Sequence, residues 1–308
     1  MKNVLVIYYT QTGQLSSAVR ATLAPLENDA SLKIHYAELL PVMPYPYPWT
    51  YMQFFDVFPE TVHGIPCKLK EIQIDPSTNY DLVVIAYQPW YLSICIPVNS
   101  FLLSEQAKLL LKDKPVITII ACRNMWLGAQ EKMKLALNIL NAKLVGNITY
   151  VDRSANLVSL ITVLAFVLAG KKENFLGIFP KYGVSDKDLK ANAPVFGGII
   201  KNNLQTGDYG AQQAELVSAG AVVVKPNLML MEGRGRALFP LYANYISKRG
   251  TAGSSERRAR VRIFGIVLPT AILLLSPVIT IVSRLAPLLF PSRMKKQVDY
   301  YSQNSLKS

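Results

Sequence analysis

The stretch that decides the fold is residues 3–17, NVLVIYYTQTGQLSS, near the start of the chain. Residues 3–9 form an apolar run rich in β-branched side chains, the pattern of a strand buried on both faces. A polar loop follows, and apolar side chains then recur at helical spacing until Pro25 closes the segment. The order strand, polar loop, helix predicts an α/β unit.

The same alternation continues to residue 151. Further apolar runs that predict buried strands lie at 32–39, 80–87, 115–122 and 144–151. Helical patterns lie between them at 97–111 and 128–141. Buried strands that alternate with helices indicate a parallel sheet covered on both faces, and right-handed crossovers make it doubly wound. We therefore predict an α/β domain over 1–151 with a five-stranded parallel sheet.

Three segments depart from this regular pattern. Residues 41–76 form an insertion of prolines and aromatic side chains between the second and third strands, and long loops of this kind tend to be lids or binding loops. Residues 152–250 predict a helix-rich extension packed on the first domain, in which 157–168 is a buried helix and 175–179, 195–200 and 216–231 are helices or short strands. Residues 251–308 are basic and apolar.

The positive charge of the chain is concentrated near its end. Of 308 residues with a net charge of +13, residues 248–308 hold 11 Lys and Arg and two acidic residues. Basic flanks bracket 21 uncharged residues at 263–283, enough to cross a hydrocarbon core of about 30 Å as a helix. With both flanks basic, an interfacial helix or a re-entrant hairpin is favoured, and a bent span and a buried core helix remain alternatives. We expect a membrane helix or hairpin on the cytoplasmic face of the inner membrane.

Other classes of protein fit the composition less well. The basic residues bracket an apolar stretch instead of interleaving with aromatic side chains, which argues against nucleic-acid binding. Cys67, Cys95 and Cys122 are widely spaced without a CxxC pair, so neither a disulfide framework nor a metal site is expected. Only one segment is long enough to span a bilayer, which excludes a polytopic membrane protein.

The loop after the first strand has the features of a phosphate site. In parallel sheets of this kind, ligands bind at the carboxyl ends of the strands. The loop places hydroxyls and backbone N–H groups at a helix N-terminus, where the free donors and the helix dipole favour an anion. Neither a Walker A sequence nor GxGxxG is present. The candidate phosphate-binding residues are Thr10, Gln11, Thr12, Gly13, Gln14 and Leu15. A simple polar helix cap is the alternative.

The segment VLVIYYTQTGQLSSAV, residues 4–19, resembles the flavodoxin-like family, whose first loop [ST]-x-T-G-x-T holds the phosphate of FMN. The resemblance covers residues 1–151 and implies a flavodoxin-like fold with bound FMN. It departs at Leu15, where the family has threonine; Ser16 and Ser17 are candidates to supply that hydroxyl. By position, the resemblance implies that two further loops flank the flavin ring. Their candidate residues are Gln88, Pro89, Trp90, Tyr91, Arg123, Asn124 and Trp126.

A narrower resemblance rests on MKNVLVIYYTQTGQL at 1–15, PYPYPWTYMQFFDVFPE at 44–60 and the basic, apolar C-terminal extension. Together they resemble the flavodoxin-like enzymes of dialkylresorcinol and flexirubin-type pigment biosynthesis, of the DarA type. This implies an aromatase that uses FMN to oxidise a dialkylcyclohexane-1,3-dione, a lipidic small molecule built by a partner ketosynthase, to a dialkylresorcinol.

Aromatisation requires a base and a partner for the enolate. His63 has the most suitable ordinary pKa, although an exposed loop histidine is the simpler interpretation. Tyr45, Tyr47 and Asp56 are alternative bases, and Arg123 is a candidate to hold the enolate oxygen.

Three other functions fit the same pattern. A membrane-associated NAD(P)H-dependent quinone or FMN reductase would share the fold and the first loop. A membrane-tethered electron carrier fits less well, because carriers of the flavodoxin type are generally acidic and this domain is mildly basic. A flavin-free scaffold for the ketosynthase is the last alternative.

Overall fold

A computed structural model describes residues 1–75, 77–152, 156–170 and 183–306. Its centre is a five-stranded sheet in which every neighbouring pair is parallel. The strands are β1 (Lys2–Tyr8), β2 (Leu32–Glu38), β3 (Leu82–Tyr87), β6 (Pro115–Cys122) and β7 (Lys143–Val151), in the order β2-β1-β3-β6-β7. Counted along the sheet this is the 2-1-3-4-5 order of the flavodoxin-like fold. The prediction of a five-stranded, doubly wound parallel sheet is therefore confirmed.

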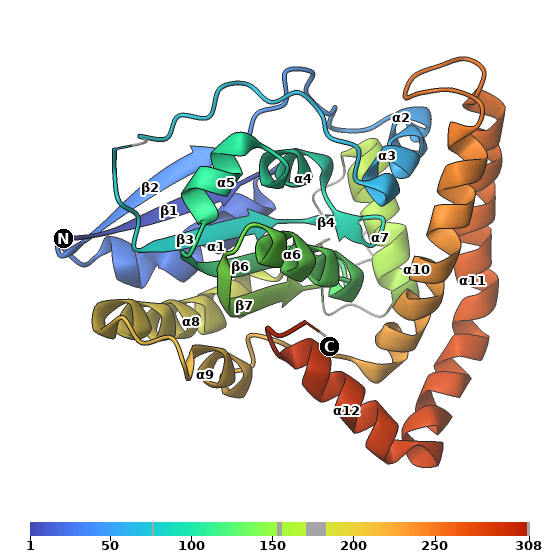
Figure 1. Ribbon diagram of the computed structural model, residues 1–308. Coiled ribbons are helices and arrows are strands. Elements are labelled where there is room, and N and C mark those ends of the chain that lie inside the picture. The colour runs from blue at the N-terminus through green and yellow to red at the C-terminus, as the bar shows by residue number, and fades with distance from the viewer. Residues whose placement is uncertain (76, 153–155, 171–182, 307–308) are drawn as a thin grey trace.

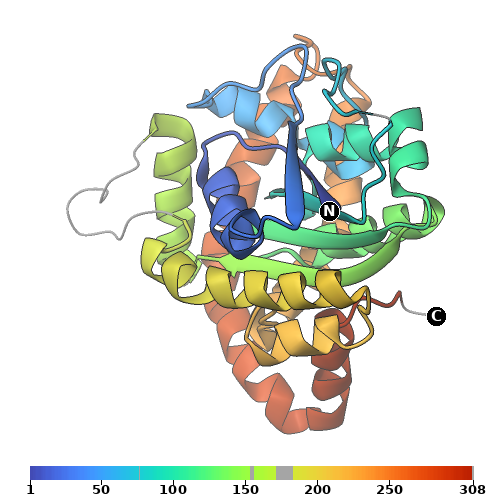
Figure 2. The same cartoon turned by 90° about the vertical axis from the view of Figure 1, so that its left-hand side faces the viewer.

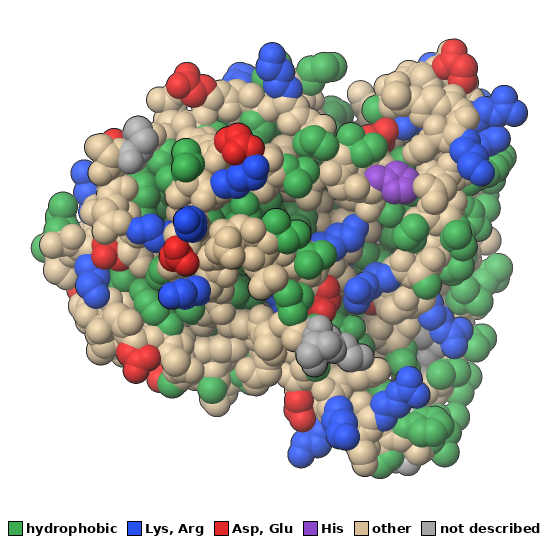
Figure 3. All heavy atoms as spheres, in the orientation of Figure 1, with side chains coloured by type: hydrophobic (Ala, Val, Ile, Leu, Met, Phe, Trp, Pro, Cys, Tyr) green, Lys and Arg blue, Asp and Glu red, His purple; other side chains and the backbone are tan. Residues whose placement is uncertain are grey.

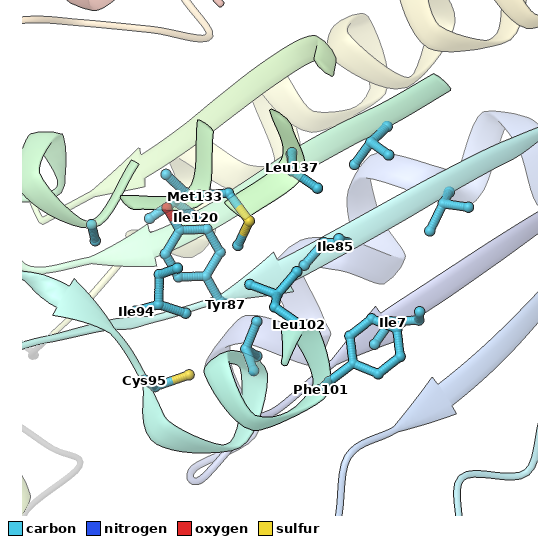
Figure 4. Close-up of a cluster of buried hydrophobic side chains, with 14 of the residues drawn as sticks. Ile7, Ile85, Tyr87, Ile94, Cys95, Phe101, Leu102, Ile120, Met133 and Leu137 are labelled. Carbon is cyan, nitrogen blue, oxygen red and sulfur yellow. The ribbon is translucent and has the colours of Figure 1, made fainter. Parts of the chain in front are cut away.

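Helices cover both faces of this sheet (Figures 1 and 2). On one face lie α1 (Gln14–Glu27) and α8 (Asp186–Thr206), and on the other lie α4 (Ile96–Leu102), α5 (Glu105–Leu111) and α6 (Leu127–Ile139). The side chains of β1 alternate between the two cores: Val4 and Val6 pack toward α1, and Leu5 and Ile7 pack toward α4 and α6. Figure 4 shows part of the second core, in which Ile7, Ile85 and Phe101 lie together.

Two helix boundaries differ from the sequence prediction. Pro25 lies inside α1, which continues to Glu27 instead of ending at the proline. The helix predicted over 97–111 is broken in two, because the Ser104 hydroxyl accepts a hydrogen bond from the Ala107 N–H (3.1 Å) and so starts α5 anew.

The insertion contains two short helices, α2 (Tyr51–Asp56) and α3 (Phe58–His63). Thr50 and Gln53 form a capping box that starts α2. A small antiparallel hairpin, β4 (Pro89–Trp90) and β5 (Ser93–Ile94), follows β3. This hairpin was not predicted, since each of its strands is only two residues long.

The rest of the described chain is helical. It comprises α7 (Asn156–Ala169), α8, α9 (Gln212–Ser218), α10 (Pro226–Ser247), α11 (Arg258–Leu289) and α12 (Pro291–Ser302). The described residues after 183 form no strand. Residues 195–200 lie within α8, and residues 216–231 comprise the end of α9, a loop and the start of α10. Residues 175–179 lie outside the described residues. Figure 1 shows α7, α10 and α11 stacked beside the ends of the strands opposite the N-terminus.

A buried arginine joins the insertion to the C-terminal helices. Arg257 is fully buried, and its guanidinium contacts Asp56 (Nε–Oδ1 2.7 Å) and Glu60 (Nη1–Oε1 2.7 Å). The Gly253 N–H donates to the second oxygen of Asp56 (2.7 Å). Removing one partner from a buried pair of this kind leaves an uncompensated charge at a cost of about 3–5 kcal/mol. The ion pairs therefore fix the start of α11 on α2 and α3.

The segment expected to form a membrane helix or hairpin is part of α11. This helix runs without a break through 263–283, so the re-entrant hairpin is not formed, and the chain turns only at Phe290. Among the helices of the described residues, none combines the length and apolar character needed to cross a bilayer.

Candidate functional site

The first loop opens α1 with an exposed helix N-terminus at the carboxyl end of β1. Gly13 precedes α1 with a φ of +86°, and no described side chain caps the helix. The Gly13 N–H donates to the Thr10 hydroxyl (3.1 Å), which closes the loop on itself. No described atom lies within 4 Å of the position that a Gly13 Cβ would occupy. The loop therefore faces open space at the point where backbone donors favour an anion.

Side chains of the first turn of α1 have different tasks. Leu15 is buried in the core beneath the loop, so only its backbone is available to a ligand. The Ser16 and Ser17 hydroxyls donate to the Gly13 carbonyl (2.9 and 3.0 Å). Both hydroxyls lie beside the loop. They are the candidates to replace the threonine hydroxyl that the resembled motif has at the position of Leu15.

The insertion passes over this loop. The Gln11 amide donates to the Pro46 carbonyl (2.7 Å), and the Trp49 N–H donates to the Val167 carbonyl of α7 (2.8 Å). The Tyr47 ring lies against Phe166, with ring centres 5.3 Å apart. Residues 46–49 and the end of α7 thus cover the edge of the sheet where the first loop lies.

Trp90 lies in an aromatic cluster at this edge, with its ring centre 5.9 Å from Tyr9, 5.0 Å from Tyr45 and 5.7 Å from Trp49. The structure thus brings together two residues that the sequence analysis assigned to different roles, Tyr45 and Trp90. Gln88 and Pro89 lead from β3 into the same hairpin.

Tyr45 is held in its neutral form. Burial raises the pKa of the Tyr45 hydroxyl far above 10, and the neighbouring Cys67 thiol raises it further. A phenol with such a pKa keeps its proton at neutral pH and can donate a hydrogen bond, but it cannot act as a base.

Tyr91 and Leu92 form the turn of the β4–β5 hairpin with positive φ angles of 46° and 60°, which is unusual for side chains of this size. The Tyr91 ring packs on Phe58 (5.1 Å), and its hydroxyl donates to the Phe54 carbonyl (2.5 Å). Tyr91 therefore belongs to the packing between the insertion and α11.

The third loop is divided between two surroundings. Arg123 and Asn124 follow β6 and are partly buried, with the Arg123 Nε donating to the Asn124 side-chain oxygen (3.3 Å). Trp126, by contrast, is 2% exposed and packs in the core beside α10. It is a core residue in the structure, although it also lines a small cavity together with Asn124, and its role beside a flavin stays a prediction.

Glu232 of α10 occupies the N-terminus of α6, a contact that sequence analysis missed. Its side chain is 1% exposed and accepts a hydrogen bond from the Gly128 N–H (2.5 Å). Burial raises the pKa of this carboxyl to about 7, although the N–H groups of the α6 N-terminus and the charge of Arg236 oppose the rise. A glutamate inside a helix carries no sequence signal for such a long-range contact.

His63 and Asp56 lie outside this cluster. His63 is exposed in the last turn of α3, a position at which basic side chains interact favourably with the helix dipole. Asp56 is paired with Arg257. The ion pair occupies the Asp56 carboxylate, and the role of His63 as a base stays a prediction.

An open hollow of about 360 Å³ lies beside the carboxyl end of β7. Its lining includes apolar side chains, Val184 and Phe196 among them, and Lys225. The preceding residue Gly183 lies so close to Gln14 that an added Cβ would be 2.4 Å from the amide nitrogen. The hollow therefore adjoins residues 183–184, which lie against the Gln14 side chain of α1.

Comparison with known proteins gives structural similarity only. No protein-family model and no curated protein matches the chain. A flavoprotein from Lactobacillus acidophilus, crystallised in complex with FMN, is 13% identical and covers 48% of this chain and 93% of its own, with a TM-score of 0.38. A putative flavoprotein from Bacteroides eggerthii is 19% identical over 56% of this chain and all of its own, with a TM-score of 0.39. A flavone reductase is 10% identical over 66% of this chain and 63% of its own, with a TM-score of 0.36.

Proposed function

We propose that the chain binds FMN through the first loop and uses it to oxidise a lipidic cyclic dione to an aromatic product. The observation that carries this proposal is the α1 N-terminus: Gly13 in a left-handed conformation, no described side-chain cap and open space beyond, at the carboxyl end of a strand in a 2-1-3-4-5 sheet. Ligand sites in such sheets lie at this edge.

The residues present fit the cofactor. Thr10, Thr12 and the N–H groups at the start of α1 would hold the phosphate as neutral donors. Trp90 and Tyr45 supply aromatic surface for a flat ring system, and residues 46–49 would exclude water above it.

We further propose that the substrate is a dialkylcyclohexane-1,3-dione and the product a dialkylresorcinol. Bound FMN would accept the hydride that the ring loses, while a ring proton leaves to a base and enolisation completes the aromatic ring. The protein's part is to hold the enolate and shield it. Arg123, at the carboxyl end of β6, supplies the positive charge, and Tyr45 remains protonated as a donor. A cyclic 1,3-dione is itself acidic, so this arrangement favours the enolate without a strong protein base.

The apolar surroundings support a substrate with alkyl chains. The aromatic cluster of Tyr9, Tyr45, Trp49 and Trp90 presents little charge, and the separate hollow beside β7 has Val184 and Phe196 in its lining. Burial of alkyl groups on such surfaces contributes about 0.8 kcal/mol per methylene. A partner ketosynthase would supply a substrate of this class.

The test uses purified full-length protein loaded with FMN, mixed without oxygen with a synthetic 2,5-dialkylcyclohexane-1,3-dione. Loss of flavin absorbance together with release of one equivalent of resorcinol is the expected result. Fast loss with NADPH and none with the dione would overturn the aromatase in favour of the reductase. Failure to bind FMN at all would overturn the flavin role itself.

A further inference from the structure

One face of α11 carries a continuous row of exposed apolar side chains. Its members recur in steps of three, four or seven residues, so they lie on one side of the helix. We define the apolar stripe as Ile263, Val267, Leu274, Val278, Ile281 and Leu285, which are between 36% and 67% exposed. Residues of the same helix near its start, Val261 and Phe264, are instead buried against α10 and the insertion.

The apolar stripe is large for a surface that faces water. It runs for 23 residues of helix, about 33 Å at 1.5 Å per residue. Leu289 and Phe290 continue it, at 67% and 59% exposed. Figure 3 shows hydrophobic side chains gathered along the edge of the molecule formed by α11. Contiguous apolar surface of this extent indicates a binding surface.

The charge around the apolar stripe indicates what covers it. Residues 257–298 contain eight Arg and Lys and no Asp or Glu. Arg262 precedes most of the stripe, and Arg293, Lys295 and Lys296 follow it, all exposed. A second copy of the chain seated on this face would bring like charges together, whereas an anionic surface would meet them favourably.

Both ends of α11 are held by the folded domain. Arg257 ties its start to Asp56 and Glu60. After the turn, α12 returns to the domain, where Tyr300 donates to Glu131 and the Gln213 amide donates to the Ser302 carbonyl (2.7 Å). The stripe is thus presented sideways on a preformed helix, so docking needs no folding step.

We propose that α11 and the start of α12 dock the protein on an anionic membrane surface. The apolar stripe lies in the boundary between headgroups and acyl chains, parallel to the surface, and the basic side chains at either end contact lipid phosphates. This inference does not depend on FMN or on the redox reaction, and its test can fail without affecting them.

The test is co-sedimentation of the full-length protein with vesicles of phosphatidylglycerol and phosphatidylcholine, and with vesicles of phosphatidylcholine alone. We expect binding to the anionic vesicles that weakens as salt is raised. The double variant Leu274→Glu, Ile281→Glu is expected to lower the affinity at least about 100-fold, since it removes two exposed apolar side chains that the docked state would bury in the membrane. Replacing Arg293, Lys295 and Lys296 by Gln is expected to weaken binding and to reduce its salt dependence.

A matched control carries the same charge change elsewhere. Leu109 and Leu135 are exposed on α5 and α6, outside the stripe, and Leu109→Glu, Leu135→Glu is expected to bind vesicles as the wild type does. Both double variants are expected to keep the wild-type melting temperature. Undiminished binding by the stripe variant, or equal binding to neutral vesicles, would overturn the proposal. So would a dimer, detected without lipid, that the stripe variant dissociates, because the stripe would then be covered by a second copy.

Discussion

The helices α1 and α6 begin at the same edge of the sheet, but a buried side chain from elsewhere in the chain contacts only the N-terminus of α6 among the described residues. The first turn of α1 follows Gly13, has no described side-chain cap and faces open space. The first turn of α6 is closed by the buried carboxylate of Glu232, which accepts the Gly128 N–H. Both termini offer donors that favour an anion. The chain supplies its own acceptor, the Glu232 carboxyl, to the α6 N-terminus, whereas no described side chain takes that place at α1.

The largest effect is expected from removing the titratable carboxyl of Glu232 at the α6 N-terminus. The folded protein holds the Glu232 pKa at about 7, above its ordinary value of 4.5, so between these pH values the folded state keeps a proton that the unfolded state has lost. Stability contributed by this proton is present below pH 4.5 and is lost as the pH rises to 7, by up to about 3 kcal/mol. Glu232→Gln is expected to abolish this fall, measured by urea unfolding at pH 5 and pH 8.

A control for this prediction is Glu105→Gln, an exposed glutamate in the first turn of α5. It is expected to leave the pH dependence of unfolding as it is in the wild type. If Glu232→Gln also left it unchanged, the Glu232 carboxyl would not be protonated in the folded protein at pH 5.

The second prediction concerns the open terminus. Thr12→Glu places a carboxylate in the first loop, where it competes with the phosphate of FMN for the same donors. We expect at least about 100-fold weaker FMN binding, or roughly 2.7 kcal/mol, measured by quenching of flavin fluorescence. Asn202→Glu adds the same charge on an exposed face of α8 and should leave the affinity unchanged. Equal affinities for all three proteins would mean that the phosphate lies elsewhere.

The third prediction tests how tightly the closed terminus is packed. A Cβ at Gly128 would lie 2.8 Å from the Leu92 carbonyl oxygen and 2.8 Å from the Arg236 side chain. Gly128→Ala is therefore expected to destabilise the protein by about 2 kcal/mol, since the β4–β5 turn must move. The free energy of unfolding, measured with urea, tests this prediction. A loss below about 0.5 kcal/mol, the usual range for surface substitutions, would contradict it.

The matching change at the open terminus has the smallest expected effect. Gly13→Ala meets no described atom within 4 Å, so its cost comes from the positive φ alone, about 1 kcal/mol. Urea unfolding of Gly13→Ala beside Gly128→Ala compares the two termini directly. A larger loss at Gly13 than at Gly128 would reverse the comparison.

The sheet could be predicted because its signal is local. Each strand is a short apolar run buried on both faces, and each loop interrupts it with polar or turn residues, as at Thr10–Gly13. The points at which helices end were harder to predict from the sequence. Ser104 divides one predicted helix, because its hydroxyl caps a new helix although the apolar spacing continues across it. The unbroken α11 shows the reverse, since its prolines do not end the helix.

The site was predictable only where chain order determines position. The first loop follows the first strand and lies at its end whatever else the chain does. Tyr91 could not be placed, because it lies in a turn with a positive φ of 46°, which a side chain of this size rarely adopts. Glu232 is 104 residues from Gly128 along the chain, and no local pattern links the two. Contacts of that separation depend on how α10 packs, which only the folded structure shows.

The ion pairs of Arg257 also order events during synthesis. Asp56 and Glu60 leave the ribosome about 200 residues before the arginine that holds them. Four strands of the sheet and the first loop are complete in sequence by residue 122, while the roof formed by the insertion still lacks its anchor. At about 5–20 residues per second, translation of the remaining 135 residues to Arg257 takes about 7–27 seconds. During this interval the insertion lacks the ion pairs that fix α2 and α3 to the start of α11, so the cover over the first loop is held less firmly than in the finished chain.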